Sequence, residues 1–285
     1  MLPSVNFKPV TVLSDLVDLV VVLGEERELP AVRSLHTPDA TASAGQSKKF
    51  GVVILDDGSC GFFFAGLDDT LSHLYACNPS QFKGAVTLDL VRNCLSADPL
   101  ARAVGLGALN ALSQHLLGVS GFKLDRASDP LGHLDLANAR HVGMVGFFAP
   151  LIKAWADNPG TLTIIEKDPQ FLGQSIPFPV TTQTDRLRDC DRVLITGSTL
   201  INDTLDDVLS HCDPAAQVAL VGPSASCLPD PIFERGVEVV GSTTVSDLPH
   251  LITLLEAGEP WRMGTTKYCI TRDQYPGIRK LIPSP

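Results

Sequence analysis

The spacing of apolar positions changes along the chain, and each spacing predicts a different kind of structure. Apolar side chains recur at helical spacing over residues 10–23, which predicts an amphipathic helix that needs a packing partner. The apolar runs 50–55 and 60–65 flank a turn sequence and predict a β-hairpin. A helix is predicted over 98–117, because an Asp-Pro pair is typical of a helix start. The first part of the chain is therefore predicted to be a small α+β domain.

Two segments are rich in turn-forming residues. Residues 35–49 combine Ser, Thr, Ala and Gly with a proline, which predicts a mobile loop. Residues 125–139 are similarly polar and contain proline and glycine, and the hydrophobic pattern changes immediately after them. We therefore predict two domains, 1–137 and 138–285.

Short apolar strands alternate with helices in the second half. Strands are predicted at 141–146, 161–165, 192–196, 217–221 and 237–240, and helices at 150–156, 204–211 and 247–257. This alternation indicates βαβ units and hence a mainly parallel sheet. The predicted fold class is α/β, with a Rossmann-like domain preceded by the smaller α+β domain. The tail 258–285 is expected to pack back over one of the two domains.

Composition and charge restrict the functional classes. The chain has 285 residues, of which 44% are hydrophobic and 19% charged, a globular mix. Its net charge of −10 gives no positive field for nucleic acid or anionic lipid. The apolar run 16–23 is too short for a membrane span. The seven cysteines never form C-x-x-C, which favours reduced thiols over disulfides or structural zinc. We expect a cytoplasmic protein whose partner is a small molecule, and homo-oligomerisation stays open.

The first strand-to-helix turn of such a sheet faces the ligand crevice, because the free N–H groups of the helix start there. That turn carries Gly143, Gly146, Phe147 and Phe148, but it does not match the G-x-G-x-x-G fingerprint. Glu166 ends the next strand 20 residues after Gly146, where nucleotide-binding folds place an acid for a ribose hydroxyl. In the alternative interpretation, the phenylalanines belong to the core and Glu166 pairs with a nearby lysine.

Two further turns follow strands in the same way. The first of them is rich in small hydroxyl residues, which can cap a helix or present donors to a ligand. Asn202 or Asp203 is expected to be a plain N-cap of the following helix. All three turns should meet at one edge of the sheet. The candidate binding residues in these two turns are Thr196, Gly197, Ser198, Thr199, Leu200, Asn202, Thr204, Gly222, Pro223 and Ser224.

These motifs together resemble a known family. Five segments are similar to the Putative heavy-metal chelation family. They are Gly143-Met144-Val145-Gly146-Phe147-Phe148, Ile165-Glu166-Lys167, 196–204, Val221-Gly222-Pro223-Ser224-Ala225 and 231–236. More loosely, the hairpin, Gly61 and the helix stretch 108–112 resemble the companion domain of that family, which is similar to the enolase N-terminal domain. The resemblance implies a ligand cleft between the two domains, with metal handling as one function to test.

A direct metal site is poorly supported by the residue pattern. A closed zinc site needs about four N or S ligands brought together. Only convergence in space could supply them, for example Glu166 with His141, Asp89 or Cys94. No G-x-S-x-G elbow or P-loop is present, so catalytic and metal-ligating residues stay unknown. The histidines are scattered and form no H-x-x-x-H or H-x-C pair. They include His73, His115, His133, His141, His211 and His250.

Three functional hypotheses follow. The first is a binding protein whose interdomain cleft captures a metal chelate or another small polar ligand. The second is an enzyme that uses an adenosyl cofactor, S-adenosylmethionine or NAD, with Glu166 on the ribose. The third is an interaction protein whose Rossmann-like half has lost its ligand. The incomplete glycine fingerprint favours the third hypothesis, and the Gly-Ser-Thr turn argues against it.

Overall fold

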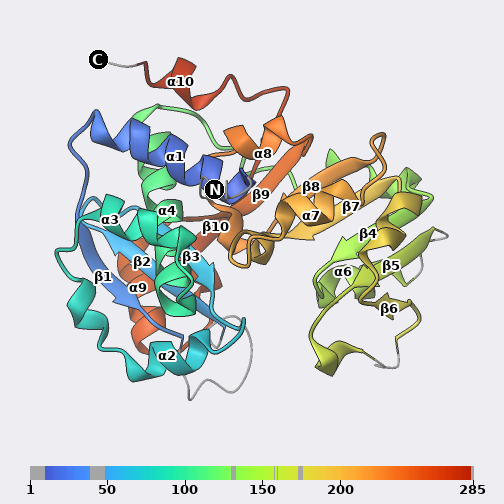
Figure 1. Ribbon diagram of the computed structural model, residues 1–285, viewed down its shortest axis with the longest axis horizontal. Helices are drawn as coiled ribbons and strands as arrows, with labels where there is room; N and C mark the ends of the chain where they lie inside the picture. The colour runs from blue at the N-terminus through green and yellow to red at the C-terminus, as the bar shows by residue number, and fades with distance from the viewer. Residues whose placement is uncertain are drawn as a thin grey trace, which may run out of the picture.

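The computed structural model describes residues 10–38, 49–129, 133–156, 158, 160–172 and 176–283. Within that part of the chain the strands form a three-stranded sheet and a seven-stranded sheet (Figure 1). The α/β class is confirmed, with the small antiparallel sheet first and the mainly parallel sheet second.

The small sheet has the order β1-β2-β3 and is antiparallel throughout. Its strands are β1 (Val32–His36), β2 (Phe50–Leu55) and β3 (Cys60–Phe64). The predicted hairpin is confirmed, because β2 pairs directly with β3. The loop predicted over 35–49 is wrong at its start, since residues 35 and 36 belong to β1, and residues 39–48 lie outside the described part.

Helices of the first half surround this sheet. They are α1 (Val12–Glu25), α2 (Thr70–Ala76), η2 (Pro79–Phe82), α3 (Thr87–Arg92), η3 (Asn93–Leu95) and α4 (Pro99–Val119). The predicted helices α1 and α4 are confirmed. Asp98 caps α4 by accepting a hydrogen bond from the Leu100 N–H at 3.2 Å. Helix α1 packs on α3 and α4, and on α8 (Asp230–Glu234) of the second half.

Helix α4 crosses β3 at very close range. A Cβ atom added to Gly61 would lie 2.0 Å from the Gly107 carbonyl oxygen and 2.3 Å from the Ala111 nitrogen. Backbone atoms occupy that space, so only glycine allows this approach. The strand and the helix are therefore locked together at this position.

The large sheet has the order β10-β9-β8-β7-β4-β5-β6, and all its pairs are parallel except β10 with β9. Its strands are β4 (His141–Val145), β5 (Thr161–Ile165), β6 (Val180–Thr181), β7 (Arg192–Thr196), β8 (Gln217–Val221), β9 (Val239–Val245) and β10 (Thr265–Thr271). The tail predicted to pack over a domain also supplies the edge strand β10. The predicted parallel sheet is confirmed, and ligands of such sheets bind at the carboxyl ends of the strands.

Short helices connect these strands. They are η4 (Leu136–Asn138), α6 (Ala149–Trp155), η5 (Pro169–Phe171), η6 (Thr184–Asp189), η7 (Gly197–Leu200), α7 (Leu205–Ser210), η8 (Pro223–Ala225), α8 (Asp230–Glu234), α9 (Leu248–Glu256), η9 (Trp261–Gly264) and α10 (Ile278–Leu281). None of the helices in the described part combines the length and the apolar character needed to span a bilayer.

The largest core cluster takes side chains from both halves. Leu16 and Leu109 come from helices of the first half, whereas Ile195, Leu220 and Tyr268 come from strands of the second. All five side chains are almost completely buried. The two sheets are thus joined through shared apolar packing, and the chain between them is not a free linker.

The second half also covers the outer face of the small sheet. Trp261, which is 1% exposed, packs on Phe62 with ring centroids 4.5 Å apart. Leu251 of α9 joins the same cluster. Because successive strand residues face opposite sides, Phe62 points to α9 while Gly61 meets α4. Figure 1 shows these two helices on either side of the small sheet.

Candidate functional site

The turn after β4 lies directly against the turn after β7. Gly146 has a φ of +96°, and its N–H donates to the Ile165 carbonyl oxygen at 2.9 Å. A Cβ atom at Gly146 would lie 2.9 Å from Thr196 Cγ2. Gly146 is therefore required both by its backbone conformation and by this close contact.

The turn after β7 in turn packs on the turn after β8. A Cβ atom at Gly197 would lie 2.8 Å from the Ala225 nitrogen. Gly222 has a φ of +122°, and its N–H donates to the Gly241 carbonyl oxygen at 2.9 Å. The three turns lie side by side at the carboxyl edge of the sheet, as the sequence predicts.

Ser224 fixes the third turn to the first half of the chain. Its side chain is 2% exposed, and its hydroxyl accepts a hydrogen bond from the Phe64 N–H at 2.9 Å. Asn110 Nδ2 donates to the Phe62 carbonyl at 2.8 Å and to the Ser224 carbonyl at 3.0 Å. Ser224 is thus a structural residue at the junction. Sequence reasoning missed Asn110, although a lone amide inside the apolar helix stretch 108–112 is a signal for a buried polar contact.

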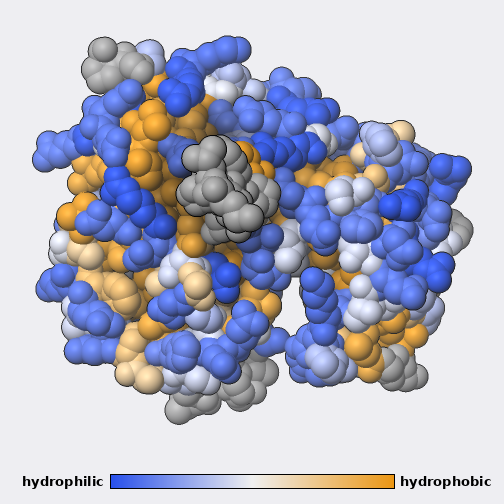
Figure 2. Space-filling model, in the orientation of Figure 1, coloured by the Kyte–Doolittle hydropathy of each residue, from blue (hydrophilic) through white to orange (hydrophobic). Residues whose placement is uncertain are grey.

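A cleft opens beside this junction. Figure 2 shows it between the lobe that holds the small sheet and the lobe that holds β4, β5 and β6. Phe147 stacks on Phe171 with ring centroids 4.4 Å apart and planes 17° apart. Lys49, which precedes β2, places Nζ 6.0 Å from the centroid of Phe171. This contact joins the two lobes, and it could not be read from the sequence because it depends on how the halves are placed.

Phe147 and Phe148 serve partly as core residues. Both are half-buried and pack against the apolar cluster under β4 and β5. Their outer parts, with Phe171, form an aromatic wall beside Gly146. The packing confirms the core interpretation of these rings, and their part in ligand binding stays a prediction.

Glu166 turns back on its own loop. Its Oε1 accepts hydrogen bonds from the N–H groups of Lys167 at 2.7 Å and Asp168 at 2.9 Å. One carboxylate oxygen is thus already committed to the backbone, which weakens the prediction that Glu166 holds a ribose. The side chain stabilises the turn after β5 instead.

Several predicted site residues lie inside the protein. Gly143 sits within β4, where a Cβ atom would be 2.6 Å from Leu187 Cδ2. Thr199 and Leu200 are 4% and 1% exposed. These residues are buried in strand β4 and in the turn after β7. Four predicted polar residues are half-buried, namely Thr196, Ser198, Asn202 and Thr204. The hydroxyl oxygens of Thr196 and Ser198 are 3.1 Å apart.

The predicted N-cap of the helix after β7 is wrong. Helix α7 begins after Thr204, whose side chain makes no capping hydrogen bond. Thr204 Oγ1 donates to Asn202 Oδ1 at 2.6 Å, and Asp203 has a φ of +53°. The four residues of η7 lengthen the connection between β7 and α7. Asn202 and Thr204 therefore form a bend before the helix begins.

The described residues contain no group of three or more His, Cys, Asp and Glu side chains that could hold a metal ion. The grouping suggested for Glu166 is not formed. His141 Nε2 lies 2.8 Å from Thr163 Oγ1, Asp89 pairs with Arg92 at 3.1 Å, and Cys94 is completely buried. Each of these side chains has a local role away from the crevice.

The thiols are protonated at neutral pH because burial raises the pKa of each of them. All seven cysteines are free. Burial raises the pKa of Cys60, Cys190, Cys227 and Cys269 to about 12 and that of Cys212 to about 11. Burial also raises the pKa of Cys77 and Cys94. Because metals bind the thiolate, these side chains would have to ionise against burial.

Solved structures share this fold over nearly the whole chain. A protein with unknown function from the DUF364 family of Pyrococcus horikoshii matches at a TM-score of 0.68 and 18% identity, over 91% of this chain and 99% of that chain. Another from Desulfitobacterium hafniense matches at 0.69 and 18%, over 91% and 98%. At this identity the likeness concerns the fold alone. A structure described as a putative mandelate racemase/muconate lactonizing enzyme from Sorangium cellulosum matches at a TM-score of only 0.24, which is too low to indicate a shared fold.

Sequence comparisons cover both halves. An uncharacterised protein of Methanocaldococcus jannaschii is 28% identical over 162 residues, which is 56% of this chain and 61% of the relative. The match thus spans about three fifths of the relative's length. Two family models, both described as Putative heavy-metal chelation, match residues 129–272 and 47–113. The first covers about half of the chain by itself, and the chain therefore belongs to the Putative heavy-metal chelation family.

Proposed function

We propose that the crevice binds a small polar ligand, and that this ligand is a metal ion already held by a small carboxylate chelator. The observation that carries the proposal is the meeting of Gly146, Thr196 and Ser198 at the carboxyl edge of the sheet. Two hydroxyls and a bare backbone suit the carboxylate oxygens and coordinated waters of a chelate. The description of the family supports a metal complex as the ligand class.

A chelated ion suits this site better than a bare one. A bare transition metal needs about four ligands from the protein, and the described residues gather no such group. The buried thiols would each have to release a proton on binding. A chelator brings its own ligands, so the protein has only to recognise the outer surface of the complex.

An adenosyl cofactor is the competing ligand. The glycine turn at Gly146 would allow its close approach, but Glu166 Oε1 is already bonded to the loop and Gly143 is packed inside the sheet. We therefore rank this second hypothesis below the chelate, and both are tested together.

Thermal unfolding with two ligand panels separates the hypotheses. One panel holds Ni²⁺, Zn²⁺ and Cu²⁺, each bare and as its citrate complex, and the other holds S-adenosylmethionine, S-adenosylhomocysteine and NAD. A ligand at a hundredfold excess over Kd stabilises the folded protein by about 2.7 kcal/mol, which gives a measurable rise in the unfolding temperature. We expect a shift with a citrate complex and a smaller one with the bare ions. A shift with only the adenosyl panel would favour the enzyme, and no shift with either would favour the interaction protein.

A matched pair of serine variants locates the binding. Ser198→Ala removes a crevice hydroxyl, and we expect it to reduce the shift. Ser210→Ala is the control, because its exposed hydroxyl lies at the end of α7 and donates to the Asp207 carbonyl. Equal loss of the shift in both variants would place the ligand elsewhere.

A further inference from the structure

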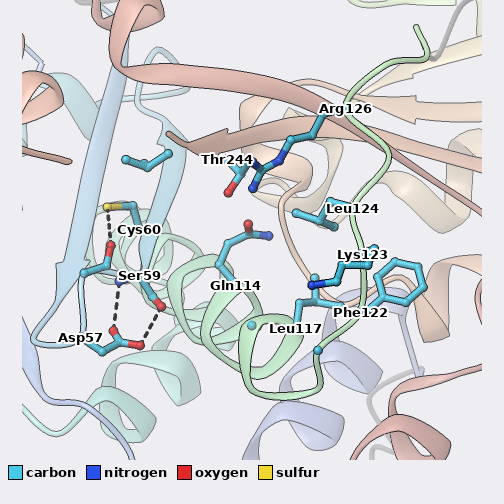
Figure 3. Close-up of a pocket in the computed structure, with 14 residues that line it drawn as sticks. Asp57, Ser59, Cys60, Gln114, Leu117, Phe122, Lys123, Leu124, Arg126 and Thr244 are labelled. Atoms are coloured by element: carbon cyan, nitrogen blue, oxygen red, sulfur yellow. Dashed lines mark hydrogen bonds between the residues drawn. The ribbon is translucent and has the colours of Figure 1, made fainter. Parts of the chain in front are cut away.

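A second cavity lies at the far end of β3 from the crevice. It encloses about 600 Å³ and is bounded by the β2–β3 turn, the end of α4, the segment 121–126 and the end of β9 (Figure 3). None of the residues that form the three turns of the crevice lines it. It is therefore a separate candidate site.

Gln114 forms a fixed part of this cavity. Its Nε2 donates to the Ser226 carbonyl at 2.9 Å and to the Tyr268 hydroxyl at 3.0 Å. Tyr268 is fully buried, so its hydroxyl holds the Gln114 amide group in a fixed position. Figure 3 shows the Gln114 oxygen on the side of Thr244 and Arg126. The cavity thus presents an amide acceptor beside a hydroxyl group.

Two cations reach the same space. Lys123 and Arg126 line the cavity, and neither forms an ion pair with any carboxylate in the described ranges. Both side chains are exposed, so a ligand can reach them from solvent.

One carboxylate, that of Asp57, lines the cavity, and Asp125 belongs to the adjoining segment 121–126; both are already engaged. Asp57 Oδ2 lies 2.7 Å from His115 Nδ1, and Asp57 also accepts hydrogen bonds from the Ser59 N–H at 3.0 Å and hydroxyl at 2.8 Å. Burial opposes ionisation of Asp57, but these hydrogen bonds outweigh it and lower its pKa. Asp125 accepts from the Ala127 N–H at 2.9 Å. The two cations are therefore left for an external anion.

We propose that this cavity binds a small organic anion that carries a carboxylate or a phosphate and at least one hydroxyl group. The anionic group meets Lys123 and Arg126, which supply charged donors. The hydroxyl donates to Gln114, and the carbon skeleton packs on Leu117 and Leu124. The site is independent of the metal-chelate crevice.

Calorimetric titration tests this assignment with malate, glycerol 3-phosphate and uncharged glycerol. We expect wild-type protein to bind at least one of the two anions, more weakly as salt rises, and to give no signal with glycerol. The double variant Lys123→Gln/Arg126→Gln should bind at least about tenfold more weakly, because it loses both charged donors. The control Lys267→Gln/Arg279→Gln removes the same charges from exposed positions outside the cavity and should bind as wild type.

The outcomes are exclusive. Absence of binding by both anions, or equal binding by the two double variants, would overturn the proposal. Preference for malate or for glycerol 3-phosphate identifies carboxylate or phosphate as the natural group. Ser198→Ala should leave anion binding unchanged, and a loss there would mean that the anion occupies the crevice instead. Failure of the anion site would leave the chelate proposal intact, since that proposal is tested with metal–citrate complexes.

Discussion

Asn110 should be one of the most sensitive polar positions in the protein. Its side chain is fully buried, and Nδ2 donates to the Phe62 carbonyl at 2.8 Å and to the Ser224 carbonyl at 3.0 Å. Asn110→Ala leaves both acceptors without a donor. A buried acceptor without its donor costs about 1–3 kcal/mol, so we expect a loss of about 2–5 kcal/mol in the free energy of unfolding.

Urea unfolding followed by fluorescence measures this loss, because Trp155 and Trp261 are 3% and 1% exposed and report on both sheets. Asn93→Ala is the control, since Asn93 is exposed and its side chain is not needed at the junction. A loss below about 1 kcal/mol for Asn110→Ala, with an unchanged denaturant slope, would refute the reasoning.

Asn110→Asp adds a pH test. An ionised carboxylate would face two carbonyl oxygens, so its folded pKa should rise above the unfolded value of about 3.9. Below that pH both states are protonated and the ionisation penalty is absent. As pH rises above it, the unfolded state loses its proton first and the variant should lose stability. A constant difference from wild type between pH 3 and 7 would contradict this.

Three further predictions concern single positions. Gly61→Ala should destabilise the protein by about 3 kcal/mol or more, because the new Cβ would overlap the backbone of α4. Gly118→Ala is the control within the same helix: its Cβ would meet open space, and it should stabilise the protein by about 0.5–1 kcal/mol. Urea unfolding measures both changes. Gly146→Ala should cost about 1–3 kcal/mol in backbone strain and also weaken crevice binding; normal binding by the folded variant would exclude this turn as a ligand contact. Asp57→Asn should lower stability at neutral pH, and the difference should disappear as pH falls through the depressed folded pKa of Asp57, which pH-dependent unfolding would show.

Much of the large sheet could be predicted because buried parallel strands form continuous apolar runs. The predicted strands 161–165, 192–196 and 217–221 have the same bounds as β5, β7 and β8. Strand β10 was missed because its first half, Thr265-Thr266-Lys267, is polar and lies at an edge. The alternation of apolar and polar residues is weak in such a strand, and the pairing of β10 with β9 depends on the tertiary structure.

The candidate site could be predicted only in outline. Glycines and hydroxyl residues after successive strands indicated where the turns meet, since the topology of a parallel sheet fixes that edge. Which of them are buried depends on contacts between distant parts of the chain. Ser224 is covered by β3 and α4, Gly143 by Leu187, and Lys49 reaches Phe171 across the cleft. These contacts join distant parts of the chain and have no local sequence signal.

The central claim is that the crevice recognises a metal chelate, and calorimetric titration with nickel citrate tests it most directly. The titration uses the Lys123→Gln/Arg126→Gln variant, so that citrate cannot bind through the cations of the second cavity. In this variant we predict saturable binding of nickel citrate, no comparable binding of citrate alone, and affinity at least about tenfold lower when Thr196→Val/Ser198→Ala is added, since that change removes two hydrogen-bonding hydroxyls. Absence of nickel citrate binding, or equal affinity with and without Thr196→Val/Ser198→Ala, would contradict the claim.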